Sequence, residues 1–217
     1  MSQTLVFSDD AGVADFRTFV SRARAADDGA IRLQASSGVL AAWVCSMRPK
    51  LLGEGTPTVL GLRTMAVARQ ADSDDTVSLA SVADRLARLE PGDRELPVPP
   101  MGVREAWASV SPPRADWRLV AQLDADRLIQ AAKTGVREVA QIIPVNPGAL
   151  IVNNARASVW GRELPDVPGV PAGAAFAGYA LGFWKPGEPV ALFQSARWLR
   201  LSSGAGHVLV RPGSQLS

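Results

Sequence analysis

Apolar and polar positions in the first ninety residues change from helical spacing to strict alternation and back to helical spacing. Apolar side chains recur every three or four residues after the N-capping run Ser8-Asp9-Asp10, and then every second residue on both sides of Ser36-Ser37-Gly38. Two alternating runs joined by such turn residues predict a β-hairpin. In chain order we expect a helix over 13–23, strands over 31–35, 39–47 and 58–68, and a helix from Ser78 or Ser81 to Leu89.

The second half of the chain shows mainly helical periodicity and ends in short alternating runs. Asp124 is placed to cap one helix, and Asn146-Pro147 to begin another. We expect a strand over 117–123, helices over 124–143, 149–160 and 172–184, and short antiparallel strands over 190–194, 198–201 and 207–211. Three helices followed by a hairpin are typical of a winged helix. The pattern therefore predicts an α+β protein: a helix, a three-strand antiparallel sheet and a helix, then a helical unit ending in a hairpin sheet, in winged-helix-like order.

A proline-rich segment separates the two halves. Six prolines lie between Glu90 and Asp116, and they remove backbone donors and fix φ. Residues 91–116 are therefore expected to be a linker packed on the domains, between a domain of residues 1–90 and a domain of residues 117–217. The halves also share the short runs Ile31-Arg32-Leu33 and Leu199-Arg200-Leu201, each beside a Ser-Ser-Gly turn. Both a duplication and chance agreement remain open.

The segment 172–184 is apolar on every side of the helix expected there. Ala174, Gly178 and Gly182 recur every four residues and form a ridge of small side chains that lets another backbone approach closely. Two interpretations follow. The helix is either the buried centre of its own domain or an apolar seam between two copies of the chain.

Few residues are available for catalysis or metal binding. The chain has one cysteine, Cys45, in an apolar run, and one histidine, His207, so Cys-ligated zinc sites and His-cluster metal sites are excluded. No Gly-x-Ser-x-Gly or phosphate-binding motif occurs. The acidic run Asp72–Asp75 lacks the glycine and the glutamate of a calcium loop, and it is expected to be a solvated turn. We therefore predict no catalytic residue, no metal ligand and no cofactor.

Charge and hydropathy give little indication of a nucleic-acid or membrane partner. The net charge is +2; residues 1–100 carry 11 basic and 13 acidic side chains, and residues 101–217 carry 12 and 8. A nucleic-acid-binding protein usually has a dense basic stripe, and the helix over 172–184 offers only Tyr179 to base edges. Nucleic acid is therefore not expected as a partner. The chain shows no signal peptide and no apolar run of about 20 residues, which predicts a cytoplasmic protein.

The hairpin near the C-terminus holds the residues best suited to a ligand. Arg197, Trp198, Arg200 and His207 combine two guanidinium groups, an indole and an imidazole, and Tyr179 is a candidate neighbour. Such a set suits a carboxylate or a phosphate. The alternative is that the polar residues of the hairpin only face solvent.

Short motifs in the last half of the chain are similar to those of a known group of proteins. The motifs are Ser111-Pro-Pro-Arg114 with Trp117, Val159-Trp-Gly-Arg162, Pro171-Ala-Gly-Ala-Ala-Phe176, Arg197-Trp-Leu-Arg-Leu-Ser202 and Gly206-His-Val-Leu-Val-Arg211. They resemble an uncharacterised family of small proteins from high-GC actinobacteria. The resemblance implies a bacterial cytosolic origin and assigns no functional residue.

These observations lead to three functional hypotheses. The first is a non-enzymatic protein-interaction or self-associating module, with a protein partner or a homodimer. The second is a small-molecule binder or enzyme, with a site for a carboxylate or phosphate between the two halves. The third is a degenerate winged helix that binds nucleic acid.

Overall fold

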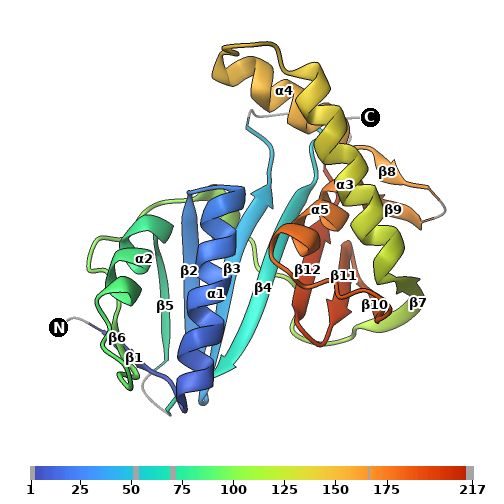
Figure 1. Ribbon diagram of the computed structural model, residues 1–217. Helices are drawn as coiled ribbons and strands as arrows, with labels where there is room; N and C mark the ends of the chain where they lie inside the picture. Colours follow the sequence, from blue (N-terminus) through green and yellow to red (C-terminus); the bar gives the residue numbers. More distant parts are fainter. Residues whose placement is uncertain (1–2, 51–53, 69–71, 166, 214–217) are drawn as a thin grey trace. The chain divides into compact units, whose positions relative to one another are not determined.

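The computed structural model describes residues 3–50, 54–68, 72–165 and 167–213, and the chain divides into two compact units (Figure 1). The first unit is Met1–Cys45 with Leu62–Ser111, and the second is Ser46–Gly61 with Pro112–Ser217. The divisions fall inside two strands, β3 (Val39–Met47) and β4 (Thr58–Ala66). The chain therefore passes from one unit to the other within β3 and β4, and again after Ser111.

The first unit is a sheet in the order β5-β2-β3-β4, with α1 lying over the face of β2 and β3 (Figure 1). β2 is antiparallel to both β3 and β5, and β1 pairs with β6 in a small separate sheet. The other elements are β1 (Thr4–Val6), α1 (Asp10–Ala26), β2 (Ala30–Ser36), β5 (Ser73–Ser78), α2 (Leu79–Ala87), β6 (Glu95–Pro97) and the short 3-10 helix η1 (Ala106–Ser109).

Local sequence signals explain where the first elements begin and end. The Asp9 carboxylate accepts a hydrogen bond of 2.7 Å from the backbone N–H of Gly12, which caps α1. The turn between β2 and β3 has positive φ at Ser37 (52°) and Gly38 (83°), the backbone form that two-residue hairpins require. Phe16 of α1 is fully buried. The turn residues thus set the register of the hairpin, and the buried Phe16 fixes which side of α1 packs against the sheet.

The second unit has the strand order β12-β11-β10-β7, with the start of β4 beside β12. All of the register pairs among β7, β10, β11 and β12 are antiparallel, and β8 pairs with β9 separately. Its elements are β7 (Arg118–Asp124), α3 (Ala125–Ile142), α4 (Ala149–Trp160), β8 (Glu163–Leu164), β9 (Val167–Pro171), α5 (Ala172–Ala180), β10 (Pro189–Ser195), β11 (Trp198–Ser203) and β12 (Gly206–Arg211).

Tight packing around α5 forms the core of the second unit. A Cβ atom on Gly178 would lie 1.9 Å from the Trp184 ring, so only glycine lets the indole lie against the helix. The indole N–H of Trp184 donates to the carbonyl of Ala175 at 2.9 Å. On the other side of the unit, the Trp160 ring stacks on Phe176 with centroids 4.5 Å apart. The side of α5 that carries Gly178 is thus filled by a residue of the same chain.

The expected winged-helix-like fold class is wrong. The C-terminal strands are not a hairpin added to a helical unit, because β7, from the start of that unit, pairs with β10 and extends the sheet. The helix expected over 172–184 ends at Ala180, since Gly182 turns the chain with a φ of 73°. The acidic run after Ala71 is also not a solvated turn. From Ser73 onward it belongs to β5, and the expected three-strand sheet thereby gains a further strand.

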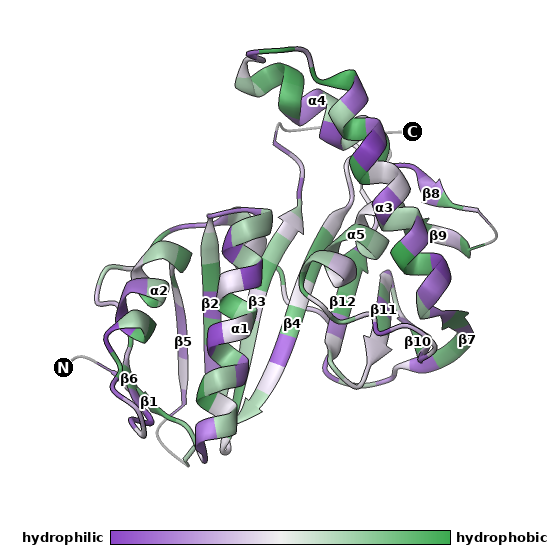
Figure 2. Cartoon of the chain, viewed as in Figure 1, coloured by the Kyte–Doolittle hydropathy of each residue, from purple (hydrophilic) through white to green (hydrophobic). Residues whose placement is uncertain are grey.

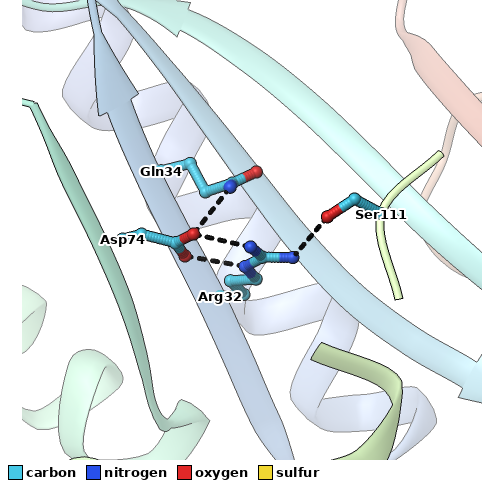
Figure 3. A network of polar contacts seen from close by, with 4 residues as sticks. All are labelled: Arg32, Gln34, Asp74 and Ser111. Atoms are coloured by element: carbon cyan, nitrogen blue, oxygen red, sulfur yellow. Dashed lines mark hydrogen bonds and ion pairs between the residues drawn. The ribbon is translucent and has the colours of Figure 1, made fainter. Parts of the chain in front are cut away.

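An ion pair explains how an acidic run forms a strand. Figure 3 shows Asp74 of β5 facing Arg32 of β2, whose Nε and Nη2 donate to the two carboxylate oxygens at 2.7 and 2.5 Å. The amide of Gln34 donates to the same carboxylate at 2.8 Å, and Arg32 Nη1 reaches the Ser111 hydroxyl at 3.4 Å. The Arg32 hydrogen bonds, helped by Gln34 and opposed by partial burial, lower the pKa of Asp74 below its ordinary value.

We expect the Asp74 contribution to stability to depend on pH. Because the folded-state pKa is lowered, the contribution is complete above the unfolded pKa of about 3.9 and is lost as pH falls through the folded value. Asp74→Asn should therefore lower the free energy of unfolding at neutral pH by about 1 kcal/mol or less, since the carboxylate is 45% exposed. Urea unfolding should show wild type and variant converging as the pH falls below that range. The exposed Asp72→Asn is the control, and an Asp74→Asn difference that persists unchanged in acid would contradict the assignment.

The contact between Gly178 and Trp184 makes a second prediction. Gly178→Ala should displace the indole and lower the free energy of unfolding by about 2 kcal/mol. The matched control is Gly204→Ala, because nothing lies within 4 Å of a Cβ at exposed Gly204. Thermal unfolding of both variants decides the matter. Equal stability of the two would show that α5 packs otherwise.

Candidate functional site

The exposed side of α3 carries a row of long polar side chains. Asp124 caps the helix by accepting a 2.8 Å hydrogen bond from the N–H of Asp126, and the apolar side of α3 is buried. In Figure 2 hydrophilic and hydrophobic colours alternate along α3. The exposed residues, three or four positions apart, are Arg127, Gln130, Lys133, Arg137 and Gln141. This spacing places them on one side of the helix, where they can donate to successive acceptors along an extended anion.

In the first unit, α1 has a shorter row of the same kind. Arg17, Thr18, Ser21 and Arg22 are exposed along it. Arg17 donates from Nη2 to the carbonyl of Leu86 at 2.9 Å, which holds its guanidinium between α1 and the end of α2. The exposed side of a helix in each unit is therefore polar and bears arginine.

A hollow of about 490 Å³ lies beside β7, β9, β10 and β11 in the second unit. Most of its lining is apolar, including Ala121, Leu123, Leu192 and Leu199, and Arg197 is its charged residue. Within the described part of the chain, no group of three or more His, Cys, Asp or Glu residues could hold a metal ion. An apolar hollow with one guanidinium suits binding rather than proton transfer.

Arg200 of β11 is held between two aromatic rings. Its guanidinium carbon lies 4.5 Å from the ring centroid of Trp117 and 4.7 Å from that of Phe193. Its Nε atom is buried and has no hydrogen-bond partner among the described residues. Burial lowers the pKa of Arg200 from its ordinary value, but a guanidinium remains charged near neutrality. The site is therefore a positive charge fixed by cation–π contacts and not neutralised by a carboxylate.

The structure divides the five predicted ligand residues among different places. Arg197 lines the hollow, Trp198 is 6% exposed, and Tyr179 of α5 is 39% exposed. Arg200 lies in β11 between its two aromatic rings, and His207 Nδ1 lies 2.9 Å from the Ser202 hydroxyl.

Sequence analysis missed the two aromatic residues that hold Arg200. Phe193 stands opposite Arg200 in the β10–β11 register. The short turn between residues 195 and 198 could have indicated this pair, because it sets the hairpin register and antiparallel partners share a face. Trp117 is far away in the sequence, and only the pairing of β7 with β10 brings its neighbourhood to β11. No local signal in the sequence marks that contact.

No helix of the described residues is long and apolar enough to cross a membrane.

Two family matches together cover most of the chain. Residues 1–109 match a domain of unknown function, DUF8010, and residues 112–215 match another domain of unknown function, DUF8185. A comparison with curated proteins found no match.

Several solved structures have a similar fold. A DNA polymerase III β subunit from Eubacterium rectale is 10% identical with a TM-score of 0.54, and 99% of this chain and 65% of that chain are covered. The corresponding subunit from Borrelia burgdorferi is 8% identical with a TM-score of 0.53 and the same two coverages. The β sliding clamp of Caulobacter crescentus is 13% identical with a TM-score of 0.51, and 100% of this chain and 66% of that chain are covered. The chain thus has a clamp-like fold and spans 65–66% of the length of these proteins.

This likeness corrects the functional expectations. The three functional hypotheses are contradicted as stated, because none of them includes a clamp-like fold, and the fold is similar to that of DNA polymerase sliding clamps. The expectation against a nucleic-acid partner is likewise contradicted, because the solved structures that share this fold are DNA polymerase subunits. Net charge and local motifs could not indicate this fold, because it depends on strand pairing between distant segments.

Proposed function

This chain belongs to the family of the domain of unknown function DUF8010, and from that premise we propose that it is a DNA-associated clamp module. Several copies would join edge to edge around duplex DNA, with the helices toward the phosphates. The proposal places the protein in the cytoplasm, in line with the sequence expectation of a bacterial cytosolic protein.

The clamp-like fold of the whole chain is the observation that carries this proposal. The match to the Caulobacter crescentus β sliding clamp extends over 100% of this chain, and therefore over both units. The chain spans 65–66% of the length of the clamps it resembles, and in the proposed ring several copies join edge to edge.

The edge strands β5 and β7 support assembly. β7 ends the strand order of the second unit, and no described strand pairs with its outer side. It also exposes Leu119 (52%) and Val120 (43%). β5 ends the order of the first unit, and residues 102–103 cover only the part of its edge near Val77. Exposed edges are templates for pairing with another chain. A β5 edge meeting a β7 edge of the next copy is a heterologous contact, the kind that closes rings.

The row on α3 supports contact with DNA. Lys133 and Arg137 are exposed, and Arg137 donates a hydrogen bond to the neutral Thr134 hydroxyl. Such cations release counterions when they meet phosphates, which attracts duplex DNA without reading its sequence.

We expect removal of two α3 charges to weaken DNA binding measurably. For Lys133→Gln/Arg137→Gln, the slope of log affinity against log salt should fall by about 2, since each phosphate contact contributes about 0.9. Fluorescence anisotropy with a short duplex, over a range of salt concentrations, measures both affinity and slope. The control Lys50→Gln/Arg104→Gln removes the same charge from exposed loop positions and should keep the wild-type slope. If the two double variants behave alike, α3 is not the DNA-contacting surface.

If a ring of copies encircles the duplex, retention of the protein should depend on whether the DNA is circular or linear. Protein bound to a nicked circular duplex should remain bound during gel filtration at moderate salt and be released after one cut linearises the DNA. Light scattering of the protein alone should give a multiple of 22.9 kDa. Equal retention on circular and linear DNA, or a monomer at every concentration, would refute ring formation.

A further inference from the structure

The strands β10, β11 and β12 present a second surface, on the side away from α5. The hydroxyl of Ser203 donates to the carbonyl of Phe183, just after α5, at 2.7 Å. Ser203 therefore faces the helix, and because strand residues alternate, Arg200 and Ser202 face the other way. The same alternation and the strand register put on that side Phe193, Arg200, Ser202, His207 and Arg211, which we call the outer face, together with the buried Ser195, Trp198 and Leu209.

The outer face is basic and contains no carboxylate from its own strands. Residues 189–195, 198–203 and 206–211 include Arg200, His207 and Arg211 and no Asp or Glu. Arg200 pairs with Leu209 in the register, so His207 and Arg211 are its diagonal neighbours, about 7–8 Å away. Three groups that can carry positive charge therefore lie within one short span.

Two aromatic contacts fix the Arg200 guanidinium, which suits it to recognising an anion. Trp117 and Phe193 hold its planar guanidinium, as described above, and no described carboxylate forms an ion pair with it. A guanidinium whose orientation is fixed loses little entropy when it binds, and its in-plane N–H groups match the two oxygens of a carboxylate.

We propose that the outer face binds an acidic segment of a protein partner, with a partner carboxylate on Arg200 and neighbouring acidic groups near Arg211. Apolar groups adjoin the charges: Phe193 pairs with Leu119 of β7, which is 52% exposed. A mixed apolar and basic surface fits a peptide with apolar and acidic side chains better than it fits a uniformly charged phosphate backbone. The outer face lies opposite α5, so this binding does not rest on the proposed DNA contact.

The test is binding of a short fluorescein-labelled peptide of alternating Glu and Leu to the full chain at low salt. A peptide with Gln in place of Glu is the matched ligand control. We expect the Glu peptide to bind at least about tenfold more tightly than the Gln peptide. A short duplex DNA added as competitor should not displace the Glu peptide.

Three variants locate the site. Arg200→Gln and Arg211→Gln should each weaken binding of the Glu peptide several-fold, and Arg200→Lys should also weaken it because the planar fork is lost. Arg197→Gln is the control, since Arg197 lines the hollow beside β9 and not the outer face, and it should change affinity by less than about twofold. Arg211→Gln leaves the aromatic contacts of Arg200 intact, so it tests the site even if Arg200 variants unfold.

Other outcomes would overturn the proposal. Equal affinity for the Glu and Gln peptides, or no binding of either, would show that the outer face does not recognise carboxylates. Displacement of the peptide by duplex DNA, together with loss of DNA binding in Arg211→Gln, would assign the surface to nucleic acid. Unchanged peptide binding in folded Arg211→Gln and Arg200→Gln would place the acidic site elsewhere.

Discussion

The two-residue alternation of antiparallel strands is the constraint on which both units depend. Once β2 pairs with β3 and β5, Leu33 must face the core while Arg32 and Gln34 face the other way. In the second unit, Leu201 is buried while Arg200 faces away from α5. The helices can cover only one face of each sheet, so the polar residues of the opposite face must be satisfied by one another, by loops or by other molecules.

The two units satisfy that requirement in different ways. Arg32 is neutralised by Asp74 of the adjacent strand, and this hydrogen-bonded partner raises the pKa of Arg32. Arg200 has two aromatic rings in place of a carboxylate, and burial lowers its pKa. Arg32 in the hairpin of the first unit therefore forms an ion pair, whereas Arg200 in the hairpin of the second unit has no carboxylate partner among the described residues. This difference explains why the face that carries Arg200 is a candidate for binding and the face that carries Arg32 is not.

A clamp-like protein would use its two sides for different partners. The α3 row offers exposed cations suited to a phosphate backbone, which requires charge but little geometry. The outer face offers a guanidinium of fixed orientation next to apolar side chains, which suits one particular group on a protein. The apolar hollow that Arg197 lines adds a third surface in the second unit.

The sequence by itself determined local structure and left the fold class undetermined. The Asp9 cap, the Ser37-Gly38 turn and the apolar spacing of α1 each act over a few residues, so their pattern predicted helix, hairpin and helix where the structure has them. The sequence did not predict β5, because its Asp74 is accommodated in the sheet only by pairing with Arg32, which is distant in the sequence. The candidate site, too, was predicted only in part. Arg200 was recognisable from its side chain, whereas Trp117 and Phe193 reach it only because β7, β10 and β11 pair with one another. The clamp-like fold was decided by tertiary structure alone, since pairing between distant strands leaves no periodicity in the chain.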